Sequence, residues 1–222
     1  MSLLDDLRYL FTAPSELFYD LDENPRFLRP LVVNLLLYFI SVSAAHFWGD
    51  FFQMSGEFSF LVELGILVIM VLLLGTLAMF FINALQSLGY FVGTKVLSYD
   101  VSYKSLLSIA MYAFIILSIG KTLETLINSK VGINDYFSFS PAFFLANTAY
   151  SNSMISALLK LINPFTIWYV LLMACGISVT SEMGKGKAIG VVILGNVIFW
   201  IIFSLIGFII YALVFIVTTL LR

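Results

Sequence analysis

Long apolar stretches alternate with short polar segments along this chain, and they predict about five membrane-spanning helices. A helix that crosses a hydrocarbon core of about 30 Å needs roughly 20 consecutive apolar residues. Neither of the two longest stretches contains a polar turn, so we predict a single long helix in each. The pattern predicts an all-α, polytopic integral membrane bundle with spans at about 28–48, 60–96, 105–127, 159–181 and 187–221.

A shorter amphipathic segment, residues 1–27, precedes the membrane domain of residues 28–222. A helix over 2–12 would place its leucines on one face and Asp5, Asp6 and Arg8 on the other. The run is too short to span a bilayer, so it predicts a helix that lies in the membrane interface. A second short helix over 15–21 is expected to do the same.

The distribution of Lys and Arg predicts the orientation of the bundle. Seven basic residues fall on one side of the predicted spans, and cytoplasmic loops carry an excess of such residues. The N-terminus is therefore predicted in the cytoplasm and the C-terminus outside. Polar and aromatic residues mix in 128–158, which predicts a partly helical flap on the outer surface, with a dip into the membrane as the alternative. Lipid headgroup contacts are expected from Arg26, Arg29, Lys95, Lys104, Lys185 and Lys187.

The overall composition excludes two broad classes of protein. Of the 222 residues, 61% are hydrophobic and only 11% are charged, which is too few for the exterior of a soluble domain. The formal net charge is −2, whereas nucleic-acid binding requires clustered basic residues. The lone Cys175 lies in an apolar run and is expected to be a small buried hydrophobe.

The stretch NPFTIWYVLLMACGISVTSEMGKGKAIGVVIL, residues 163–194, carries a family resemblance. Its order and spacing resemble the closing half of a Yip domain, the family of Ypt/Rab-interacting membrane proteins. Residues 13–31 are similar to the amphipathic lead-in of that family. The residues that carry the resemblance open the fourth span, lie near its end, or form the basic loop after it: Asn163, Pro164, Phe165, Trp168, Gly176, Lys185, Gly186 and Lys187.

This resemblance implies five spans, a cytoplasmic N-terminus and no catalytic activity. It also implies a role in membrane organisation, membrane shaping or partner recruitment. Eukaryotic members bind prenylated small GTPases, but this chain lacks their long cytosolic arm, so GTPase binding is not inferred. The short N-terminus and the absence of N-x-S/T sequons favour a bacterial cytoplasmic membrane.

The residues themselves supply little enzymatic chemistry. The chain has one histidine and one cysteine and lacks a complete phosphate-binding loop, so no catalytic residue, metal or cofactor is predicted. His46 and Asp50 have a spacing that could share a metal, but solvated polar residues explain them more simply. An intramembrane enzyme is the least favoured alternative.

Polar residues inside the apolar stretches support a second functional hypothesis. Such groups are costly in a membrane unless they face the bundle interior or water. They could form a polar seam in a small transporter, channel or lipid-moving protein, although a local Lys121–Glu124 ion pair is a simpler reading of two of them. Two G-x-x-x-G pairs could support packing within the chain or a homo-oligomer. The candidate seam consists of Asn34, Asn83, Gln86, Lys121, Glu124 and Asn196.

Overall fold

The computed structural model describes residues 2–48, 71–131, 137–145 and 162–220, together with 65–66, 68–69, 155–156 and 159. The described residues are helical apart from short connections. The elements are α1 (Leu3–Thr12), α2 (Pro14–Glu23), α3 (Leu28–Trp48), the π-helical turn η2 (Val71–Gly75), α5 (Thr76–Val96), α6 (Tyr103–Val131), the 3-10 turn η3 (Pro141–Leu145), α8 (Pro164–Ser181) and α9 (Lys185–Leu220).

The long helices confirm the predicted all-α, multi-pass membrane bundle. Within the described residues, four helices are long and apolar enough to cross a membrane, and α3 contains a shorter apolar stretch over Leu28–Ala44. The predicted span at 187–221 corresponds to α9, which is one helix of 36 residues. The four membrane-crossing segments are Leu73–Val96, Tyr103–Ser129, Pro164–Ser181 and Lys185–Ile209.

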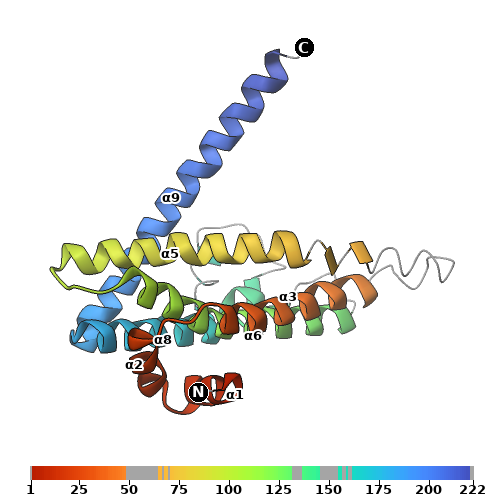
Figure 1. Cartoon of the computed structure of the whole chain (residues 1–222). Helices are drawn as coiled ribbons and strands as arrows, with labels where there is room; N and C mark the ends of the chain where they lie inside the picture. The colour runs from red at the N-terminus through yellow and green to blue at the C-terminus, as the bar shows by residue number, and fades with distance from the viewer. Residues whose placement is uncertain are drawn as a thin grey trace.

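Helix α6 forms the centre of the bundle. Helices α3, α5 and α8 all pack against it, and α9 packs against α5 and α8 (Figure 1). Within the most apolar 18-residue stretch of each helix, the buried share is 67% in α6 and 22% in α9. In Figure 1 the later part of α9 extends away from the other helices. The described side chains of this part are mostly apolar and many are exposed, with Trp200 59% and Phe208 70% exposed, which is typical of a helix surrounded by lipid.

Glycines allow two close helix contacts. A Cβ atom on Gly89 of α5 would overlap the backbone carbonyl oxygen of Gly195 in α9. A Cβ atom on Gly176 of α8 would likewise overlap Ile109 of α6. Small residues let membrane helices approach until their backbones touch, so these positions set the spacing of the bundle.

The N-terminal segment differs from the predicted surface helices. Ser2 and Asp5 form a capping box at the start of α1, and the bonds from Ser2 lower the pKa of the Asp5 carboxyl. However, the apolar face is turned towards the protein, since Leu10, Leu17, Phe18 and Leu21 have no exposed surface. The ring of Phe11 contacts that of Trp168 in α8, with their centroids 5.4 Å apart. The segment therefore packs along the side of the bundle (Figure 1).

Several predictions fall on parts of the chain outside the described residues. These include Asp50, the side chain of His46, and the outer flap of 128–158 apart from 128–131, 137–145 and 155–156.

Candidate functional site

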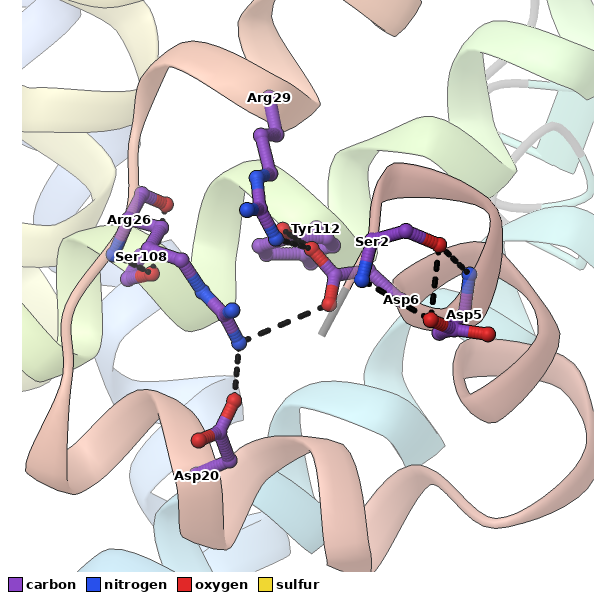
Figure 2. A network of polar contacts seen from close by, with 8 residues as sticks. All are labelled: Ser2, Asp5, Asp6, Asp20, Arg26, Arg29, Ser108 and Tyr112. Atoms are coloured by element: carbon purple, nitrogen blue, oxygen red, sulfur yellow. Dashed lines mark hydrogen bonds and ion pairs between the residues drawn. The ribbon is translucent and has the colours of Figure 1, made fainter.

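A buried carboxylate connects the N-terminal segment to the bundle. Asp6 is completely buried, accepts a hydrogen bond of 2.6 Å from the hydroxyl of Tyr112 and forms a 2.9 Å ion pair with Arg29 (Figure 2). The guanidinium of Arg26 lies 3.6 Å from the other carboxylate oxygen and also pairs with Asp20. Because these groups belong to α1, α2, α6, the start of α3 and the linker before it, the cluster joins elements that are distant in sequence.

The linker between α2 and α3 holds this cluster in place. The backbone N–H of Arg26 donates to Ser108 Oγ (3.1 Å), and the same hydroxyl donates to the Arg26 carbonyl (2.8 Å). The hydroxyl of Ser105 donates to the carbonyl of Asp22. The early turns of α6 therefore fix the linker, so that the arginine side chains reach Asp6.

Arg26 and Arg29 form ion pairs that the sequence analysis does not predict. Both were expected to contact lipid headgroups, but their side chains are only 20% and 37% exposed and form ion pairs with acidic residues. The acidic partners come from the amphipathic segment that was predicted to lie separately in the interface. The positions of charged residues along the sequence do not show which of them will pair between separate helices.

A second polar cluster lies where α5, α8 and α9 meet. Asn196 accepts hydrogen bonds from Gln86 (2.8 Å) and from the hydroxyl of Tyr90 (3.1 Å). The hydroxyl of Tyr90 also lies 2.8 Å from that of Tyr169. Hydrogen bonds between membrane helices satisfy polar groups that would otherwise be unpaired in hydrocarbon, so this cluster connects three helices.

Asn34 forms a third, separate polar contact between α3 and α6. Its amide nitrogen donates to the carbonyls of Pro30 (2.9 Å) and Met111 (3.1 Å), and its oxygen accepts from Ser118 (2.6 Å). Asn83 of α5 instead donates to the carbonyl of Met79, within its own helix. These groups support individual helices and pairs of helices.

Lys121 and Glu124 do not form the expected ion pair in the described part of the chain. Glu124 instead accepts hydrogen bonds from the Ser138 hydroxyl (2.9 Å), the Phe139 backbone N–H (3.0 Å) and the Asn163 side chain (3.3 Å). It therefore connects α6 to the outer segment and to the start of α8. The side chain of Lys121 is exposed.

The predicted polar seam is therefore distributed over separate sites. Gln86 and Asn196 come together, whereas Asn34, Asn83, Lys121 and Glu124 have other surroundings. Sequence spacing carries no signal that Asp6 is a partner of Tyr112 and the two arginines, because these residues meet only after the N-terminal segment has packed. Among the described residues, no three metal-ligating side chains lie close together. The His46–Asp50 pair lies outside the described side chains.

The motif that resembles a Yip domain has clear local roles. Asn163 accepts the Phe165 N–H as the N-cap of α8, and Pro164 occupies the first turn, where a missing N–H costs little. The ring of Phe165 packs where a side chain on Gly120 would lie. Lys185, Gly186 and Lys187 are exposed at the start of α9, as are Lys95 and Lys104 at the same end of the bundle.

The comparison with family models agrees with this architecture. The model of the Yip1 domain matches residues 8–206. The chain belongs to the Yip1 domain family. This confirms the resemblance carried by residues 163–194 and identifies a multi-pass integral membrane protein. The Yip1 match begins within α1 and ends within α9, so it includes the second half of α1 and all of α2. No curated protein and no solved structure matches the chain.

Proposed function

We propose that this Yip1 family protein organises or shapes the membrane and recruits partners, without catalysing a reaction. The docked N-terminal segment is the observation that carries this proposal. Leu10 and Phe18 of the segment are buried against the bundle, while Leu4 is 78% and Tyr19 63% exposed. The segment therefore adds a second apolar surface beside the spans.

The position of this segment beside the spans supports an effect on membrane shape. Helix α2 packs against α8 and α6, and Asp22 at its end meets Ser105 in the first turn of α6. That end of α6 follows a loop that is predicted to be cytoplasmic. Binding of amphipathic helices to membranes is sensitive to curvature, so we expect this segment to couple the bundle to membrane shape.

The rival function, a transporter, channel or lipid-moving protein, requires polar groups that share one route through the bundle. The candidate groups are instead distributed over separate helix contacts, and Asn34, Asn83 and Asn196 donate to nearby backbone carbonyls. This distribution supports structural roles for them and favours membrane organisation over conduction.

Reconstitution into liposomes tests the proposal. Vesicle shape would be followed by electron microscopy, with ion flux and scrambling of a labelled lipid measured on the same preparation. We expect tubulated or smaller vesicles with silent flux, and a weaker effect for Asp6→Asn, which loosens the segment. Glu16→Gln is the matched control, because Glu16 is an exposed carboxylate of α2. Flux or scrambling that is lost in Glu124→Ala would instead support the conduit.

Partners and location remain predictions. The lipid bilayer is the expected partner, and a homo-oligomer or another membrane protein could cover the exposed part of α9. Nucleic-acid and small-GTPase binding are not expected. A bacterial cytoplasmic membrane stays the favoured location on the sequence arguments above.

A further inference from the structure

A cavity of about 380 Å³ lies between α3, α5 and α6, away from the N-terminal segment. Its volume falls in the range of roughly 300–1,000 Å³ that is usual for small-molecule sites. Val42, Met79, Phe114 and Leu117 supply apolar walls. Because the chain is embedded in lipid, an open apolar cavity of this kind is accessible to a hydrocarbon chain.

The serine and threonine hydroxyls that line the cavity donate their hydrogens within the protein. Ser41 donates to Thr122 (3.0 Å), and Thr122 donates to backbone carbonyls of α3 and α6. Ser118 donates to Asn34 (2.6 Å), and Thr125 donates to the carbonyl of Lys121 (2.9 Å). The serine and threonine side chains therefore offer no free donor to a polar solute, which favours an apolar occupant.

Lys121 provides a cationic group among the described residues that line this cavity. Its side chain is exposed, and the nearby Glu124 is engaged by Ser138, Phe139 and Asn163. In the described ranges, Lys121 forms no ion pair. A charged group beside hydrocarbon is costly unless an opposite charge or the headgroup layer is within reach.

The position of Lys121 along α6 matches the headgroup level. At about 1.5 Å per residue, Lys121 lies about 27 Å from Tyr103, the first residue of α6, compared with a hydrocarbon thickness of about 30 Å. Asn163 and Pro164 begin α8 beside Glu124, one turn further along. The ammonium can therefore reach the phosphate layer while Phe114 and Leu117 line the deeper part of the cavity.

We propose that this cavity binds an anionic phospholipid, with one acyl chain between α3, α5 and α6 and the phosphate beside Lys121. The apolar walls account for the acyl chain, and Lys121, which forms no ion pair with another described residue, accounts for the negative headgroup. This site goes beyond the proposed function, because it involves none of the residues that hold the N-terminal segment.

Native mass spectrometry of the delipidated, detergent-solubilised protein tests the site. Phosphatidylglycerol and phosphatidylcholine with identical chains serve as lipid probes, and glycerol phosphate tests the headgroup without a chain. We expect about fivefold tighter binding of phosphatidylglycerol than of phosphatidylcholine, a ratio that corresponds to about 1 kcal/mol for one basic side chain. Lys121→Ala and Lys121→Gln should abolish this preference, whereas Arg8→Ala, which removes an exposed charge elsewhere, should keep it.

Val42→Phe provides a second, independent variant. It narrows the cavity without changing charge and should weaken the binding of both lipids. Equal binding of the two lipids by the unmodified protein, or a preference that survives both lysine substitutions, would overturn the proposal. Glycerol phosphate that displaces phosphatidylglycerol at equal concentration would also overturn it, because the site would then bind a free anion. The vesicle-shape assay depends on different residues, so the two proposals can fail separately.

Discussion

The hydroxyl of Tyr112 donates a 2.6 Å hydrogen bond to the carboxylate of Asp6, which lies 106 residues earlier in the chain. This contact places a carboxylate of the first helix against the central helix of the bundle. Arg29 and Arg26 neutralise its charge from the start of α3 and the linker before it. An acidic residue can therefore be fully buried here, because it has opposite charges and a hydroxyl donor within reach.

Asp6→Asn should loosen the N-terminal segment. Removing one member of a buried ion pair typically costs about 3–5 kcal/mol, but Arg26 and Arg29 are partly exposed, so we expect about 2 kcal/mol. That cost corresponds to roughly a 30-fold increase in the open form of the segment. The rate of tryptic cleavage after Arg8 and Arg26 in detergent measures it.

Glu16→Gln is the control for this substitution, since it removes an exposed negative charge from α2. It should leave the cleavage rate nearly unchanged. Equal cleavage of Asp6→Asn and the unmodified protein would show that the ion pairs do not hold the segment.

Glu124→Gln should release the outer segment from α6. Oε1 of Glu124 accepts three hydrogen bonds, and a neutral amide oxygen is a weaker acceptor than a carboxylate oxygen. Hydrogen exchange over residues 137–145 should become faster, while exchange in the middle of α6 should not change. Glu182→Gln, at the end of α8 where the chain turns into α9, is the matched control. Unchanged exchange at Phe139 would contradict this role of Glu124.

Gln86 and Asn196 should be energetically coupled. Their side chains form a 2.8 Å hydrogen bond between α5 and α9. Interhelical hydrogen bonds in membranes contribute about 0.6 kcal/mol on average and up to about 1.7 kcal/mol. Thermal unfolding of Gln86→Ala, Asn196→Ala and the double variant should give a coupling free energy in this range. Strictly additive effects would mean that the two residues act independently.

The hydrophobic pattern predicts the helices well because the bilayer requires long apolar stretches with internally satisfied backbones. The boundaries predicted for 28–48 and 187–221 lie close to α3 and α9 for this reason.

The partners of buried polar side chains depend instead on packing between distant segments of the chain. In the sequence, Asp6 belongs to the polar face of a predicted surface helix. Its partners Arg26, Arg29 and Tyr112 reach it only through packing between distant parts of the chain. Glu124 looks like a partner of Lys121 because of local spacing, but the turn of chain at 138–139 reaches it from outside the helix. Sequence spacing reports neighbours on one helix and not those contributed by another.

The contact between Gly89 and Gly195 predicts that alanine substitutions at different glycines will have very different effects on stability. Gly89→Ala would push a methyl group into the backbone of Gly195 and force α5 and α9 apart. Overpacking of this kind typically costs about 1–3 kcal/mol. Gly190→Ala is the matched control on α9, because a Cβ atom there meets nothing within 4 Å and alanine favours a helix over glycine. Thermal unfolding in detergent should show a clear loss of stability for Gly89→Ala and no loss for Gly190→Ala. Equal behaviour of the two variants would mean that the close approach of α5 and α9 does not limit the packing of the bundle.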